Sequence, residues 1–222
     1  MKRLNISKAA ATIIMLSCAT LSVQGEQLNP QGSSVEDIVP AGWLHQEASG
    51  DLNKDGIADL VIIATPDDAE NLKTRDDGYV YNFNQPVLAI YFGNAQGQFQ
   101  QWKQYDNVIP ADDSEFCHHD IVLTITDRNT LRIATELWCS AGSYGASTDT
   151  YTFRYQNGDF YLIGMDHEER QRNTGECVTT SENYLTWKRQ VLTSNFTNTK
   201  PPKEKWSKLS KKPLEHLGDR EL

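Results

Sequence analysis

Short apolar stretches separated by Gly, Asn and Asp recur along the chain from Trp43 onward. In most of them apolar and polar residues alternate, which is typical of strands with one buried face. Residues 60–65 (LVIIAT) instead form a continuous, largely β-branched apolar run, which predicts a strand buried on both faces. No convincing amphipathic helix is predicted after residue 25, although residues 67–73 and 204–217 could each form a short one.

Pairs of these stretches, joined by turn residues, predict β-hairpins. Four are expected, at residues 86–105, 120–138, 149–166 and 183–194. The third turns at Asn157 and Gly158, a dipeptide that accepts the positive φ angles of a tight hairpin turn. Serial hairpins predict an antiparallel all-β fold: a meander, a sandwich or an open barrel. A full propeller is excluded, because about 170 ordered residues are too few for at least four four-stranded blades.

An acidic loop stands directly before the buried strand, in the sequence SGDLNKDGIADLVIIAT. Counted from the first acidic residue, side-chain oxygens occupy positions 1, 3, 5 and 9, which are Asp51, Asn53, Asp55 and Asp59. Gly56 stands where the chain must turn, and the next residue can offer its backbone carbonyl. Ca²⁺ takes six to eight oxygen ligands from such loops, whereas backbone capping accounts for only one or two of these side chains. The loop therefore predicts a calcium site.

This pattern, D-x-[DN]-x-D-G-x-x-D, resembles the calcium loop of FG-GAP or VCBS repeats, found in integrin-type propellers and many exported bacterial proteins. The segment at about residues 43–102 is similar to one whole repeat. The resemblance implies that Ca²⁺ is bound by the side chains of Asp51, Asn53, Asp55 and Asp59 and the carbonyl of Ile57. The motif occurs once, so propeller architecture and adhesive function are not implied. The other half resembles parts of small exported bacterial proteins and adds no chemistry.

The N-terminus predicts export. Basic residues precede an apolar run of about 15 residues, the length of a signal-peptide core and too short for a membrane span. Small residues then favour cleavage after Gly25, so residues 1–25 are expected to be a signal peptide and the protein periplasmic or secreted. The sequence MLSC loosely resembles a lipobox, which makes a lipid anchor at Cys18 the less favoured alternative.

Charge and composition restrict the partners. Without the signal peptide the chain has 18 basic and 30 acidic residues, a net charge of −12, which disfavours nucleic acid and anionic membranes. No further segment could span a bilayer. We expect a flexible lead-in at 26–40, one all-β domain at 41–199 and a basic C-terminal extension at 200–222. The expected partner is a protein or glycan of the cell envelope.

Three cysteines follow the signal peptide, so at most two can pair within the chain. If residues 126–130 form a hairpin loop, with Asn129 in the left-handed conformation, cross-strand partners have numbers that sum to 256. This register puts the mostly apolar odd-numbered positions from 121 to 137 on one face. It also places Cys117 opposite Cys139, which predicts a disulfide between them and a free thiol at Cys177.

Catalytic patterns are weak. His118 and His119 are neighbours in a predicted strand and must point to opposite faces, so they cannot share one metal ion. Ser143 lacks the glycine spacing of a nucleophile elbow. We therefore expect an exported calcium-binding β-domain that acts as a binding or structural module. The alternative is an envelope hydrolase with its catalytic group in the loops at 66–85 or 111–119.

Overall fold

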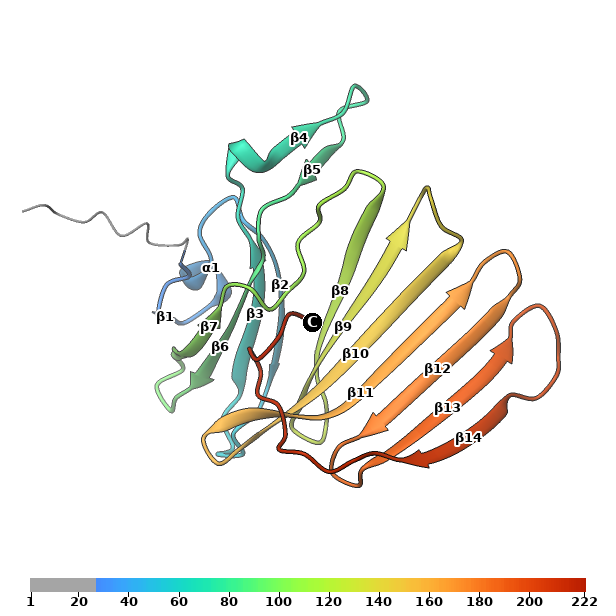
Figure 1. Cartoon of the computed structure of the whole chain (residues 1–222). Coiled ribbons are helices and arrows are strands. Elements are labelled where there is room, and N and C mark those ends of the chain that lie inside the picture. The colour runs from blue at the N-terminus through green and yellow to red at the C-terminus, as the bar shows by residue number, and fades with distance from the viewer. Residues whose placement is uncertain (1–26) are drawn as a thin grey trace, which may run out of the picture.

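The computed structural model describes residues 27–222, so the predicted signal peptide and Cys18 lie outside the described residues. The fold is almost entirely antiparallel β-structure, arranged as a five-stranded sheet, a seven-stranded sheet and a small two-stranded ribbon (Figure 1). The all-β prediction is thus confirmed. Among the described residues no helix is both long and apolar enough to cross a membrane.

The five-stranded sheet has the buried apolar run at its centre. Its strand order is β1-β7-β6-β3-β2, from β1 (Gln31–Gly32), β7 (Phe99–Tyr105), β6 (Val87–Gly93), β3 (Asp59–Thr65) and β2 (Leu44–Gly50). Strand β3 pairs with β2 on one side and β6 on the other, and its residues 59–64 are all buried. The predicted burial on both faces is confirmed, because each face of this sheet packs against a separate apolar cluster.

The N-terminal segment covers one face of the five-stranded sheet. It contains α1 (Val35–Ile38), which begins with a capping box between Ser34 and Asp37. Ile38 is fully buried, and the Tyr91 hydroxyl donates a hydrogen bond to the Asn29 carbonyl. The stretch expected as a flexible lead-in therefore packs against the sheet, because its few apolar residues all face β3 and β6.

The seven-stranded sheet is a meander that curls into an open half-barrel (Figure 1). Its strands follow chain order: β8 (Cys117–Ile125), β9 (Thr130–Cys139), β10 (Gly145–Gln156), β11 (Asp159–Gln171), β12 (Glu176–Asn183), β13 (Lys188–Asn195) and β14 (Lys203–Lys208). The first three predicted hairpins are present, with positive φ at Asn157 and Gly158 as expected. The fourth is larger than predicted, because β12 begins before residue 183 and the turn falls at 184–187.

One apolar core joins the two large sheets. The five-stranded sheet contributes residues such as Val61, Ile63 and Ile90, and the half-barrel contributes Ile133 and Phe153. Aromatic rings fill the space between the sheets, with Trp102 and Phe160 in edge contact at 5.3 Å between ring centroids. The core therefore lies between the layers and fixes one sheet against the other.

The C-terminal segment is part of this assembly. Residues 203–208 add β14 to the sheet edge, where the sequence pattern allowed a short helix. Farther on, Leu217 is 2% exposed in the core between the sheets, and its amide donates to the Phe160 carbonyl at 2.9 Å. The Leu222 amide donates to the Val108 carbonyl at 2.8 Å. Leu217 is flanked by polar residues and belongs to no periodic apolar pattern, so the sequence did not predict that it is buried.

The long polar stretch at 66–85 forms a projecting arm. It consists of a 3₁₀ turn, η1 (Ala69–Asn71), followed by the ribbon of β4 (Leu72–Thr74) and β5 (Val80–Asn82), which stands away from the sheets (Figure 1). The buried Asn84 side chain donates to the Asp68 carbonyl at 3.1 Å and fastens the base of the arm.

Candidate metal site and neighbouring groove

The acidic loop connects β2 to β3 at one end of the five-stranded sheet. Its chain reversal needs two residues with positive φ, Lys54 at 65° and Gly56 at 86°. A Cβ on Gly56 would meet nothing within 4 Å, so glycine is favoured there by backbone conformation and not by space. The turn predicted at Gly56 is therefore present.

Three of the predicted ligand side chains fold over the loop backbone. The Asp51 carboxylate accepts hydrogen bonds from the amides of Asp55 and Gly56, each at 3.0 Å. The Asn53 side-chain oxygen accepts from the Asp55 amide at 2.9 Å, and Asp55 Oδ1 accepts from the Ile57 amide at 2.8 Å. These short-range bonds direct the oxygens of all three side chains toward the loop and leave further lone pairs on each.

Asp59, the fourth side chain, has a different environment, because it is fully buried. Its Oδ2 accepts from the amides of Leu52 at 2.8 Å and Asn53 at 3.2 Å, and its Oδ1 accepts from the Gly93 amide at 3.1 Å. Burial raises the pKa of this carboxyl, although the three amide hydrogen bonds act in the opposite direction. With both lone pairs of Oδ2 occupied, Asp59 can offer a cation only Oδ1.

The chemistry of the loop fits a hard cation. In the described part of the chain, no Lys, Arg or His side chain forms an ion pair with Asp51, Asp55 or Asp59, so their negative charge is not neutralised by the protein. The oxygens available are the carboxylates of Asp51 and Asp55, Oδ1 of Asp59, one amide oxygen and the Ile57 carbonyl, the donor types that Ca²⁺ prefers. Over residues 27–222 there is no cluster of three or more His, Cys, Asp or Glu side chains placed to hold a metal, so the amide and carbonyl donors are essential to such a site.

The loop also touches the half-barrel. Leu52 is fully buried in the core shared by the sheets, and the Asn129 side chain donates a hydrogen bond to the Asp51 carbonyl. Just before the loop, a Cβ on Gly50 would lie 2.6 Å from a methyl carbon of Ile125. The acidic loop is therefore a junction between the sheets, a relation that the local sequence pattern does not reveal.

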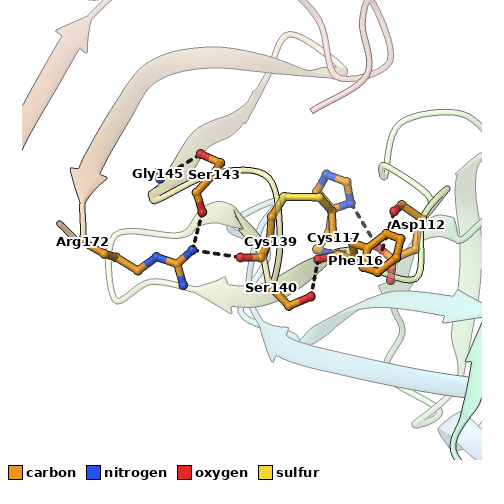
Figure 2. The surroundings of a disulfide bond; sticks show 10 residues. Asp112, Phe116, Cys117, Cys139, Ser140, Ser143, Gly145 and Arg172 are labelled. Atoms are coloured by element: carbon orange, nitrogen blue, oxygen red, sulfur yellow. Dashed lines mark hydrogen bonds and ion pairs between the residues drawn. A yellow bond between two sulfur atoms is a disulfide. The ribbon is translucent and has the colours of Figure 1, made fainter.

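The predicted disulfide is present at the open end of the β8–β9 hairpin (Figure 2). Cys117 and Cys139 are direct cross-strand partners with Cα atoms 4.1 Å apart, and every pair from Ile125–Leu131 to this one follows the predicted register. Asn129 has the predicted positive φ, at 59°. Cys177 is the free cysteine of the described residues.

Polar contacts hold the loop that follows the disulfide. Arg172 donates to the carbonyls of Cys139 and Ser143, each at 2.9 Å (Figure 2). Its guanidinium lies 5.2 Å from the Trp138 ring centre. Ser140 donates to the Phe116 carbonyl through its amide at 2.7 Å and its hydroxyl at 3.2 Å. The Gly/Ser-rich stretch around Ser143 is therefore a tethered turn between β9 and β10.

A groove of about 440 Å³ lies between the projecting arm and the first residues of β8. Residues 79–82 and residues 112–121 both contribute to its lining, so it brings together the two loops considered for a hydrolase. His119 Nδ1 lies 3.1 Å from Asp112 Oδ1, while the ring of His118 packs 5.3 Å from that of Trp138. The two histidines thus have different nearest partners, although both line this groove. The Asp112–His119 pair was missed, because a loop fold-back and not strand periodicity brings the two side chains together.

Together these features define an all-β protein with one acidic β-hairpin loop at the junction of two sheets. Residues 45–83 match the FG-GAP repeat family model, and this segment contains the whole acidic loop and β3. Neither the curated proteins nor the solved structures gave a match to the chain. The FG-GAP resemblance is thus confirmed for the segment that carries the acidic loop.

Proposed function

We propose that the protein is an exported calcium-binding β-domain that acts as a binding or structural module of the cell envelope. Ca²⁺ is held by the side chains of Asp51, Asn53 and Asp55 and by the Ile57 carbonyl, with Oδ1 of Asp59 as the remaining protein ligand. The observation that carries the proposal is an FG-GAP-type loop whose carboxylates have no basic partner among the described residues.

The ion would stabilise the contact between the sheets. The loop that carries Asp51 and Asp55 also carries Leu52, which packs in the shared core, and it accepts the hydrogen bond from Asn129 of the half-barrel. Neutralising the loop carboxylates removes their mutual repulsion and holds these two contacts in place. Single sites of this type in extracellular modules have dissociation constants on the order of 0.1–1 mM, which suits an exported protein.

Export is supported by two independent features. The N-terminal sequence has the basic, apolar and small-residue order of a signal peptide. The Cys117–Cys139 disulfide belongs to an oxidising compartment.

Calorimetry on the purified protein tests the calcium site. Ca²⁺ that binds only the folded state should raise the melting temperature. At 100 times its dissociation constant, the ion adds about 2.7 kcal/mol to the free energy of unfolding. Asp55→Ala should abolish this shift. Asp76→Ala removes the same charge from an exposed turn of the projecting arm and should retain it. No shift in the wild type, or equal shifts in the wild type and Asp55→Ala, would exclude the site.

A second candidate function is hydrolysis in the groove beside the arm. Asp112 holds Nδ1 of His119, which leaves Nε2 free to take a proton from a water molecule, as a general base must. Thr65 is the one Ser or Thr that lines this groove in the described chain, so water is the nucleophile that the lining favours. Ester, peptide, phosphate and glycoside substrates should be assayed with wild type and His119→Ala. Activity that His119→Ala abolishes would establish the hydrolase, and absence of turnover would leave the binding module.

A further inference from the structure

The outer face of the half-barrel, turned away from the shared core, carries a second groove of about 470 Å³. Its floor consists of two cross-strand rows. One row runs from Asp166 through Ser181 and Gln190 to Trp206. The other runs from Gly164 through Asn183 to Lys188. The small residues in these rows, Gly164 and Ser181, leave the centre of the face hollow.

Four basic side chains from four separate segments line this groove. They are Lys54 of the acidic loop, Arg128 of the β8–β9 turn, Arg154 of β10 and Lys188 of β13. These turns and strand ends gather at the lower end of the molecule in Figure 1. In residues 27–222 none of the four forms an ion pair, and Arg154 is held only by the neutral side chain of Gln156.

The acidic residues of the lining do not cancel this charge. Glu182 belongs to the opposite face of β12, where its carboxylate accepts from the Tyr184 hydroxyl and pairs with Arg189. Asp166 Oδ2 lies 3.9 Å from Nη2 of Arg132, which is a further basic residue of the outer face. The groove is thus locally basic, although the chain is acidic overall. An anionic ligand would therefore be held by the side chains of the groove itself and not drawn in by the net charge of the protein.

Trp206 gives the end of this floor an apolar surface. Its side chain belongs to β14 at the edge of the sheet, and the residue is 58% exposed. Its indole N–H is occupied by Glu204 Oε1, so the ring offers a ligand mainly its apolar face. An exposed indole beside unpaired basic groups suits a molecule that has both a flat apolar surface and a negative charge.

We propose that this groove binds an acidic polysaccharide, with uronate carboxylates on the basic side chains and a sugar ring stacked on Trp206. Carboxylates match the planar guanidinium groups of Arg128 and Arg154 in bidentate geometry. A sugar chain carries about one charge per residue or fewer, so the net negative charge of the protein repels it only weakly. Double-stranded DNA carries one charge per about 1.7 Å and is repelled far more strongly.

Titration calorimetry with a hyaluronan hexasaccharide, in calcium-containing buffer and again with a chelator, tests the proposal. We expect saturable binding that weakens with salt, and no binding of dextran, a neutral polysaccharide. Arg128→Ala and Trp206→Ala should each weaken binding about tenfold, the equivalent of 1.4 kcal/mol. Lys211→Ala removes the same charge from the C-terminal segment outside the groove and should bind as the wild type does.

Three results would overturn the proposal: no saturable binding by the wild type, equal affinities for Arg128→Ala and Lys211→Ala, or binding of a DNA duplex as tight as that of the hexasaccharide. The outcome is independent of the calcium site. Apart from Lys54, the groove residues lie outside the acidic loop, so a missing calcium-dependent melting shift would not count against the groove.

Discussion

Across the acidic loop, Asp59 Oδ2 accepts a hydrogen bond from the Leu52 amide, with 2.8 Å between nitrogen and oxygen. The last acidic residue of the loop thereby fixes the residue that enters the core between the sheets. Two further amides, of Asn53 and Gly93, donate to the same carboxylate, which links the loop to the end of β6. The FG-GAP-type loop is therefore held by the protein itself through Asp59, while Asp51 and Asp55 remain available to an ion.

Replacing Asp59 should destabilise the fold without calcium. Asp59→Ala leaves three amides without their acceptor in a buried site, and each such loss costs about 1–3 kcal/mol, so we expect a total on the order of 3 kcal/mol. Asp55→Ala removes contacts from an exposed loop and should cost less than about 1 kcal/mol. Urea denaturation of both variants in a chelating buffer measures the difference. Equal costs would show that Asp59 is not the structural carboxylate.

The side chain of Asn129 should stabilise the junction between the sheets. Asn129→Gly keeps the positive φ but loses the hydrogen bond to the Asp51 carbonyl, at a cost of about 1 kcal/mol. Asn157→Gly is the matched control, because Asn157 also has positive φ in a hairpin turn but is exposed, and its side chain makes no hydrogen bond to any residue that the structure describes. The free energy of unfolding of the Asn157→Gly variant should differ from that of the wild type by less than about 0.5 kcal/mol. Chemical denaturation compares the two, and equal effects would argue against the inter-sheet bond.

The disulfide should stabilise the β8–β9 hairpin. Its cysteines are 22 residues apart, and loss of a disulfide closing a loop of that size costs roughly 2–4 kcal/mol. The double variant Cys117→Ser, Cys139→Ser should show this loss, while Cys177→Ser should stay within about 0.5 kcal/mol of the wild type. Peptide mapping without reductant should give a Cys117–Cys139 peptide, and a linked Cys177 would contradict the structure.

The C-terminal segment should be required for full stability. Leu217→Ala removes a side chain that is 2% exposed in the shared core and should cost about 2–4 kcal/mol. Leu185→Ala is the control, since Leu185 is 45% exposed in a turn and its truncation should cost less than about 0.5 kcal/mol. Thermal melts of the two variants decide the matter: matching melting temperatures would mean that residues after β14 lie outside the cooperative fold.

Local sequence determined the features that depend on short-range geometry. The alternation of apolar residues and the turn at Asn129 specified the β8–β9 register, and with it the Cys117–Cys139 pair. A one-residue slip would have moved the whole apolar face into solvent, so one register is strongly favoured. The continuous apolar run predicted the doubly buried β3, and the spacing of Asp51, Asn53 and Asp55 around Gly56 predicted the loop.

Tertiary structure decided the rest, because long-range contacts leave no periodic signal. The buried Asp59 carboxylate accepts one of its three amide hydrogen bonds from Gly93 of another strand. Three other relations also join segments whose spacing follows no strand or helix period. They are the Asp112–His119 pair, the packing of Leu217 in the shared core, and the presence of Lys54 and Lys188 in the lining of one groove. Which polar residues meet is set by how the two sheets pack and curl, and that packing is a property of the whole apolar core and not of any single stretch of sequence.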